Sequence, residues 1–323
     1  MFVRIHQHLL DFPGTLIFGW NDIGVPDVSG IRVAVVTRPD RPRGRGQRPA
    51  ASEVGAEAEA LRLPVLKPER VNAPEWLERL AAHEPELFAV VAFGAILSAE
   101  LLRVPRVGCI NLHGSLLPEY RGASPVQRAL ADGRPRTGVT TLWMDEGIDT
   151  GDCILQQWAP IESVDNAGTL AARLAELGAP LLAQSLRLAY EGRAPRHPQD
   201  RAAGTYAPRL SKAEGEVDWA GDVESVWNHQ RAVTPWPGAA TAFQGRRLAI
   251  LSAAPLHRLA TGREPGEVIA ATGVGVDVAC RPGALRLLRV KPEGKSEMGA
   301  AEWARGSRIV AGHSFERAKE TEA

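Results

Sequence analysis

GCINLHGSLLPEYRGASPVQRALADGRPRTGVTTLWMDEGIDTGD, residues 108–152, is the stretch that decides how the rest of the chain can be arranged. It opens on an apolar run that ends in Asn111 and His113, and at strand spacing two side chains two residues apart leave the same face of a sheet. A second strand-like run, residues 138–144, leads into the acidic turn DEGIDTGD, which contains Asp149. The sequence therefore predicts an amide, an imidazole and a carboxylate at strand ends.

Outward from this stretch, apolar strands alternate with helices. Continuous β-branched or apolar runs predict buried strands, and amphipathic or alanine-rich runs predict helices. The strands are expected at residues 31–37, 87–92 and 108–112, and the helices at residues 53–63, 74–83, 99–103, 124–131 and 166–188. This alternation predicts an α/β domain with a parallel sheet and right-handed crossovers. Ligands of open sheets bind beyond the carboxyl ends of the strands, where residues 93–97 and the three polar side chains fall.

The composition changes after this domain. Residues 190–208 mix proline, glycine and charged residues without apolar periodicity, which predicts a linker. A short helix is expected at residues 223–231, and the short apolar segments beyond it, about ten residues apart, are typical of a small antiparallel barrel. We therefore expect a first domain over residues 1–189 and a second over residues 209–323.

The bulk composition limits the class of protein. A chain of 323 residues is long enough for about two domains, and its 38 acidic and 38 basic residues give no net charge, so any nucleic-acid surface must be local. The three cysteines have neither CxxC nor Cys/His ligand spacing, so we expect no disulfide framework, no metal site and a reducing cytoplasmic location. No apolar run reaches the roughly 18–20 residues of a membrane span, and no export signal is recognisable.

The residue types at residues 108–152 indicate acyl-transfer chemistry without a covalent nucleophile. The amide of Asn111 can stabilise a developing oxyanion, and the imidazole of His113 can exchange a proton with an attacking amine. The carboxylate of Asp149 can orient and charge that imidazole. Taken alone, an Asn-x-His pair is more often structural, and Ser115 offers a hydrolase alternative, but its surroundings lack the GxSxG pattern.

A basic stretch, residues 38–49, reads RPDRPRGRGQRP, and its prolines and glycines predict a loop without regular structure. Composition alone allows a solvated surface, and arginines spaced by glycine also suit a nucleic-acid backbone. The linker adds a second basic patch, made up of Arg193, Arg196, His197 and Arg201. No P-loop or GxGxxG motif is present, so a nucleotide cofactor is not indicated.

Several motifs together resemble one family. TRPDRPRGRG, GCINLHGSLLPEYRGASPVQRAL, TGVTTLWMDEGIDTGD, YAPRLSKAEGEVDW, TPWPGA and KPEGK are similar in order and spacing to methionyl-tRNA formyltransferases of the folate-dependent formyltransferase superfamily. The resemblance runs from about Ile31 to Phe315. It implies a Rossmann-like formyltransferase domain followed by an OB-like β-barrel domain that helps to hold tRNA. The implied reaction moves a formyl group from 10-formyltetrahydrofolate to the α-amino group of initiator methionyl-tRNA.

The resemblance also implies site residues. Asn111, His113 and Asp149 would be the catalytic set, and no metal is implied. The folate pocket would be formed by Phe93, Gly94, Ile96, Leu97, Ser115, Leu116, Leu117, Pro118, Met144, Asp145, Gly147 and Ile148. The tRNA would be contacted by Arg41, Arg43, Arg45, Arg193 and Arg196. We expect a monomer that does not bind membranes.

Residues 1–30 depart from the family pattern. A strand is recognisable at residues 15–20, but the family's GTPxF turn is absent, and only ten residues, NDIGVPDVSG, precede Ile31. A crossover between parallel strands needs about a dozen residues, so the sequence leaves open whether residues 1–30 complete one edge of the sheet. Two alternatives to the methionyl-tRNA enzyme remain open: a formyltransferase for another amine, such as a nucleotide amino sugar, and a weakened folate- or tRNA-binding member.

Overall fold

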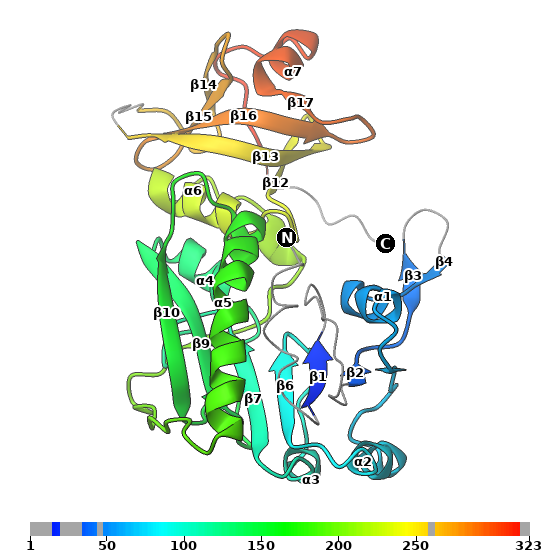
Figure 1. Ribbon diagram of the computed structural model, residues 1–323. Helices are drawn as coiled ribbons and strands as arrows, with labels where there is room; N and C mark the ends of the chain where they lie inside the picture. The colour runs from blue at the N-terminus through cyan, green and yellow to red at the C-terminus, as the bar shows by residue number, and fades with distance from the viewer. Residues whose placement is uncertain (1–14, 20–33, 44–47, 258–261, 317–323) are drawn as a thin grey trace. The chain divides into compact units, whose positions relative to one another are not determined.

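The computed structural model describes residues 15–19, 34–43, 48–257 and 262–316 (Figure 1). Its contacts divide the chain into two compact units. The first unit includes the described residues up to Pro125 together with residues 137–159 and 172–207. The second unit includes residues 126–136, 160–171 and the described residues from Pro208 onward. No described helix is both long and apolar enough to cross a membrane.

A seven-stranded sheet forms the centre of the first unit. Its strands, in spatial order, are β10 (Cys153–Pro160), β9 (Arg136–Trp143), β7 (Gly108–His113), β6 (Leu87–Val91), β1 (Thr15–Gly19), β2 (Ala34–Val36) and β5 (Val65–Leu66). The strands from β7 to β5 are parallel, and β9 is antiparallel to β7. The predicted α/β, mostly parallel architecture is confirmed.

Strand β1 lies inside this sheet. Ile17 stands opposite Val35 of β2 on one side and Ala89 of β6 on the other. β1 is therefore not an edge strand: it has a parallel partner on each side, and β5 forms the edge beyond β2. The segment that must cross from β1 to β2 lies outside the described residues.

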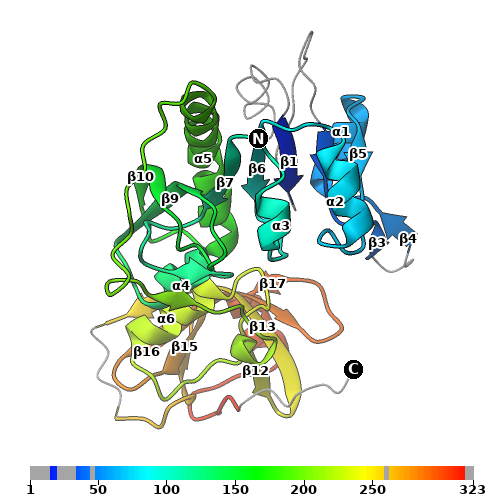
Figure 2. The ribbon, with the colours of Figure 1, turned by 90° about the horizontal axis from the view of Figure 1, so that it is seen from below.

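Helices cover both faces of the sheet, as buried parallel strands require (Figure 1 and Figure 2). The helices of this unit are α1 (Glu53–Ala60), α2 (Pro74–Ala81), α3 (Ala99–Leu102) and most of α5 (Ala167–Tyr190). On one face Ala89 and Ile110 pack with residues of α1 and α5, such as Val54 and Leu186. On the other face Phe88 and its neighbours pack with residues of α2 and α3. The alternation of side chains along β6 produces these two cores.

The basic stretch forms a small antiparallel ribbon of β3 (Arg41–Arg43) and β4 (Arg48–Ala50), so the expectation of a loop without regular structure is wrong. Pro42 stands opposite Pro49. A proline pair suits the non-hydrogen-bonded position of an antiparallel ladder, where backbone N–H groups point away from the partner strand. The ribbon therefore loses no ladder hydrogen bond at its prolines.

The second unit contains a curled antiparallel sheet. Its strands, in spatial order, are β12 (Ala240–Phe243), β13 (Arg246–Leu256), β16 (Ala284–Pro292), β15 (Val276–Ala279) and β14 (Val268–Ala271), with β17 (Met298–Gly299) also paired to β16. Helices α6 (Val223–Ala232) and α7 (Ala300–Gly306) belong to this unit, as does most of α4 (Pro125–Ala131). The rings of Phe243, Trp303 and Phe315 meet in its core. The predicted OB-like architecture of the C-terminal part is confirmed.

Candidate active site

The direction of β9 determines how the acidic turn reaches β7. Trp143, at the end of β9, stands opposite Ile110, and Thr140 stands opposite His113. β7 and β9 run in opposite directions, so their carboxyl ends lie at opposite edges of the sheet. The prediction that Asn111, His113 and Asp149 all lie beyond carboxyl ends at one edge is therefore wrong. Asp149 meets the end of β7 because the turn at residues 145–152 runs back along the strand.

Internal hydrogen bonds hold this turn in shape. The Asp145 carboxylate accepts hydrogen bonds from the Gly147 N–H at 3.0 Å and from the Thr150 hydroxyl at 2.7 Å. A Cβ atom on Gly151 would lie 1.8 Å from the Trp143 carbonyl oxygen, so only glycine allows the turn to pass β9 here. Asp149 itself has φ 53°, a left-handed conformation that aspartate adopts more readily than most residues other than glycine. This residue type thus suits the turn.

The carboxylate of Asp149 joins the other two predicted catalytic residues. Its Oδ1 accepts from Asn111 Nδ2 at 3.2 Å, and its Oδ2 accepts from the Gly122 N–H at 2.9 Å. The same Oδ2 lies 3.4 Å from His113 Nδ1. We call Asn111, His113 and Asp149 the catalytic cluster.

The ring of His113 is fixed from both sides. Its Nε2 lies 2.8 Å from the carbonyl oxygen of Tyr120, which can only accept, so Nε2 carries a proton. The residue is 5 % exposed. Nδ1 faces the Asp149 carboxylate, so a proton gained at Nδ1 would turn this contact into an ion pair. The cluster can thus take up a proton and stabilise the resulting charge.

Ser115 and Cys109, the serine and the cysteine nearest to His113 along the chain, are not suited to covalent catalysis. Ser115 is fully buried, and its hydroxyl donates to the Glu119 carbonyl oxygen at 2.6 Å instead of to a base. Burial raises the pKa of the Cys109 thiol to about 12. Within the described residues, no group of three or more histidine, cysteine, aspartate or glutamate side chains could hold a metal ion.

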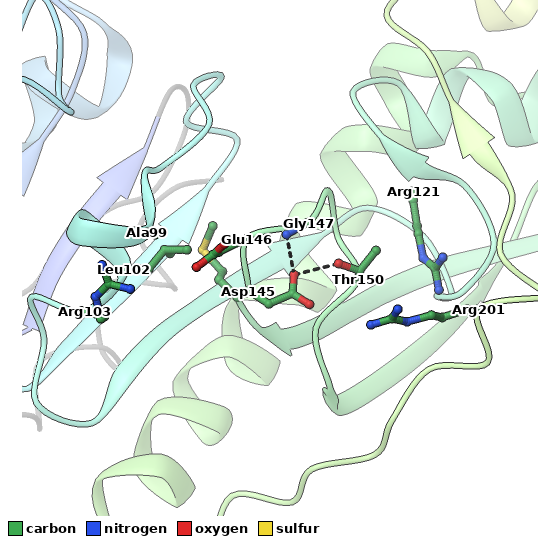
Figure 3. Close-up of a pocket in the computed structure, with 10 residues that line it drawn as sticks. Ala99, Leu102, Arg103, Arg121, Asp145, Glu146, Gly147, Thr150 and Arg201 are labelled. Carbon is green, nitrogen blue, oxygen red and sulfur yellow. Dashed lines mark hydrogen bonds between the residues drawn. The ribbon is translucent and has the colours of Figure 1, made fainter.

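A cavity of about 770 Å³ borders the acidic turn (Figure 3). Its lining consists of Ala99, Leu102, Arg103, Arg121, Met144, Asp145, Glu146, Gly147, Thr150 and Arg201. Arg121 and Arg201 lie at one end of this lining and Arg103 at the other (Figure 3). The volume is within the range of roughly 300–1,000 Å³ that is usual for sites of small organic ligands.

Three of the predicted folate residues, Met144, Asp145 and Gly147, line this cavity. Ile148, from the same turn, is exposed. Of the predicted 93–97 wall, Phe93 and Leu97 pack into the core, Gly94 adopts a positive φ and Ile96 is exposed. Residues 115–118 form a loop braced against β9 and β10, in which the Leu117 N–H donates to Thr140 and the Leu117 carbonyl accepts from Gln156. The side chains of Leu116 and Pro118 are half-buried in that loop.

The predicted tRNA-contacting arginines have different surroundings. Arg41 is exposed on β3, Arg43 ends the same strand and Arg45 lies outside the described residues. Arg193 is paired with Glu191. Arg196 lies 4.4 Å from the ring centre of Trp143 and 3.7 Å from the Asp152 carboxylate.

Comparisons with known proteins agree with this geometry. The family model for formyl transferase matches residues 24–186, and the model for the formyl transferase C-terminal domain matches residues 209–308. A protein of Moorella thermoacetica named methionyl-tRNA formyltransferase is 43% identical over 304 residues, covering 92% of this chain and 97% of the relative. A protein of Syntrophus aciditrophicus with the same name is 41% identical, covering 93% and 96%.

The chain belongs to the methionyl-tRNA formyltransferase family. The fold of this formyltransferase chain is also similar to a solved N-formyltransferase from Helicobacter canadensis in complex with folinic acid and dTDP-3-aminofucose. The TM-score is 0.61 and the identity 15%, with 89% of this chain and all of that chain covered.

The sequence analysis missed three features of this candidate site. Arg121 and Arg201 line the cavity, and Gln199 hydrogen-bonds the acidic turn, although residues 190–208 were predicted only as a linker with a basic patch. Arg121 lies in GCINLHGSLLPEYRGASPVQRAL, one of the motifs that carried the resemblance, so the sequence offered a reason to include it in the site. Gln199 is surrounded by proline and charged residues, and nothing in that pattern marks it.

Proposed function

We propose that this chain transfers a formyl group from 10-formyltetrahydrofolate to the α-amino group of initiator methionyl-tRNA. The observation that carries the proposal is the Asp149 carboxylate, which contacts both Asn111 and His113 beside a ligand-sized cavity. The close relatives that bear the name of this reaction match nearly the whole chain.

The cluster supplies the two functions that formyl transfer needs. Asn111 Nδ2 has two protons, of which one is directed to Asp149, so the other can stabilise negative charge on the formyl oxygen as the amine attacks. His113 holds its Nε2 proton on Tyr120, so its Nδ1 is the nitrogen that can accept the proton released by the amine. Asp149 stabilises the imidazolium that this step produces. The formyl C–N10 bond of the folate then breaks, and His113 returns this proton to N10 of the departing tetrahydrofolate. No residue of the chain needs to become covalently modified.

The cavity suits a folate. Asp145 and Glu146 provide carboxylates, the turn provides backbone groups, and Arg103 and Arg201 provide cations. A pterin ring presents hydrogen-bond donors and acceptors, and the glutamate tail of the folate presents carboxylates that arginine binds well. We propose that the turn binds the pterin, together with the predicted residues 93–97 and 115–118, and that an arginine at one end of the cavity binds the tail.

The tRNA is proposed to bind along basic segments of the chain. Arg41 and Arg43 belong to β3, Arg45 follows two residues later in the sequence, and Arg193 and Arg196 belong to the segment after α5. Phosphate contacts need charge and reach more than a fixed side-chain geometry, which suits exposed arginines.

We also propose that the chain is a cytoplasmic monomer. All three cysteines are free, as is usual for a reducing compartment. Light scattering of the purified chain at several concentrations would measure the mass, and a constant dimer mass would overturn the proposal of a monomer.

A competition between acceptors tests the proposed function. The chain would be incubated with 10-formyltetrahydrofolate labelled in the formyl group, with charged initiator tRNA and a nucleotide-linked amino sugar in one mixture. We expect label on the methionine of the tRNA and none on the sugar. Label on the sugar alone, or on neither acceptor from folded protein, would overturn the proposal.

A further inference from the structure

We propose that Gln199 is a positioning residue for the catalytic cluster, an inference that rests on the proposed function. Gln199 is half-buried in a segment that is otherwise largely exposed. Its Nε2 donates to the carbonyl oxygens of Asp149 at 2.9 Å and Gly151 at 2.7 Å. Its Oε1 accepts from Arg121 Nε at 3.1 Å and Nη2 at 2.8 Å.

These four contacts fix the orientation of the amide. Two carbonyl oxygens can only accept, and a guanidinium can only donate. A flipped amide would place its oxygen against two carbonyls and its N–H groups against the guanidinium. Glutamine in this one orientation is therefore the complementary side chain, and the isosteric glutamate is not.

The position of Gln199 connects the two loops that surround the cluster. Asp149 and Gly151 belong to the acidic turn, and Arg121 belongs to the loop that supplies the Tyr120 carbonyl and the Gly122 N–H. Strand β11 (Tyr206–Ala207) pairs in parallel with β8 (Arg121–Gly122), which anchors the segment after Gln199. The backbone of this segment is thus attached on one side, and the Gln199 side chain reaches across to the other.

These contacts hold Asp149 in place through its backbone as well as its side chain. Asp149 holds a left-handed backbone conformation, and its carbonyl oxygen is fixed by Gln199 while its carboxylate is fixed by Gly122 and Asn111. When the Gln199 amide is removed, the Asp149 carbonyl oxygen loses this hydrogen bond. The backbone of Asp149 is then less restrained, and its carboxylate can move away from His113. Gln199 touches neither His113 nor the reacting atoms and acts through Asp149.

The test uses Gln199→Met, which keeps the length of the side chain, and Gln199→Glu, which keeps an oxygen for Arg121 but loses both donors. We expect kcat for formyl transfer to fall between about 10- and 100-fold in both variants, since a displacement of about 1 Å is enough for such a loss. The KM for tRNA should stay within about twofold, whereas the KM for folate should rise less than kcat falls, because the loosened turn also lines the proposed folate cavity. Gln157→Met, at an exposed glutamine, is the matched control and should leave kcat unchanged.

A double-mutant cycle with Asp149→Ala separates positioning from a general structural role. If Gln199 acts through Asp149, Gln199→Met should change kcat by less than about twofold in the Asp149→Ala background. Losses that multiply would overturn the inference, as would a kcat of Gln199→Met equal to that of the parent chain or a change confined to KM.

Hydrogen exchange gives a readout that does not depend on activity. Gln199→Met should speed exchange at residues 145–152 and at the Gly122 amide, with the melting temperature unchanged and the other segments as in the parent chain. If the parent chain formylates no methionyl-tRNA, the proposed function fails, and exchange alone then decides the positioning role. Unchanged exchange at residues 145–152 would overturn it.

Discussion

The catalytic cluster and the β3–β4 ribbon differ in how firmly their side chains are held. In the cluster, one carboxylate contacts an amide, an imidazole and a backbone N–H, and the imidazole is 5 % exposed. In the ribbon, three residue pairs join two strands, and Arg41 and the two prolines are exposed. The cluster is fixed by several side-chain contacts, whereas the contacts described for the ribbon are the pairings between its two strands.

This difference indicates what each region does. Proton transfer and oxyanion stabilisation depend on atoms held within a fraction of an ångström, so a buried network is required. Attraction to a phosphate backbone acts over a Debye length of about 8–10 Å and tolerates moving side chains. Damage to the cluster should therefore lower kcat, and damage to the ribbon should raise KM.

The largest effect is expected from His113→Ala. It removes the proton acceptor, so the rate of formyl transfer should fall by at least about 100-fold while KM changes little. Initial-rate kinetics with saturating folate measure this. His83→Ala, at an exposed histidine outside the site, is the control. Retained activity in His113→Ala would remove His113 from the mechanism. It would also contradict the distinction between a cluster that determines kcat and a ribbon that determines KM.

A smaller effect, of a different kind, is expected when Arg41, Arg43 and Arg45 are all changed to alanine. The KM for tRNA should rise roughly 10-fold or more, and the slope of log affinity against log salt should become shallower by about one for each phosphate that the variant no longer neutralises. The rate at saturating tRNA should be unchanged. Filter binding at several salt concentrations gives the slope.

The control for the ribbon removes the same charge elsewhere. Arg62, Arg70 and Arg136 are exposed in the structure, and their combined change to alanine should leave the salt slope close to that of the parent chain. An equal loss of affinity in both triple variants would show that net charge matters, and not the position of the ribbon.

Gly151→Ala tests how tightly the acidic turn of the cluster is packed, through its effect on the free energy of unfolding. The new Cβ would meet the Trp143 carbonyl oxygen at 1.8 Å, so the turn must shift, at a cost of roughly 1–3 kcal/mol in the free energy of unfolding. Transfer should fall with it. Gly273→Ala, where nothing lies within 4 Å, should change stability by less than about 0.5 kcal/mol. Equal denaturant midpoints for the two variants would contradict the packing described for the turn.

The smallest expected effect is a difference in reactivity among the three cysteine thiols. Burial raises the pKa of Cys109 and Cys280 to about 12, so at pH 8 both remain protonated and unreactive. The pKa of Cys153 is also raised by burial, but this thiol is only half-buried. Iodoacetamide should therefore modify Cys153 first, as peptide mass spectrometry can detect. Early labelling of Cys109 would mean that β7, which carries Asn111 and His113, opens readily.

Much of the fold and the centre of the site followed from local patterns. Continuous apolar runs identified β6 and β7, and the two-residue spacing of Asn111 and His113 predicted that both side chains leave the same face, where both contact Asp149 in the structure. These predictions succeed because strand periodicity is a local property of the backbone.

The features that sequence missed depend on partners far along the chain. The direction of β9 and the interior place of β1 are set by which strands pair, which no local pattern records. The ribbon depends on a pairing register that places Pro42 opposite Pro49, which the composition of the segment does not reveal. Gln199 joins residues 149 and 121, about 50 and 78 positions away, through an amide that looks ordinary in its own segment.

The most direct test of the account is the single-turnover rate of N-formylmethionine formation on saturating methionyl-tRNA by three chains measured side by side. The parent chain and the triple ribbon variant should form product at rates within about twofold, and His113→Ala should be at least about 100-fold slower. No product from the folded parent chain would contradict the proposed function. A ribbon variant as slow as His113→Ala would contradict the division between fixed chemistry and electrostatic binding.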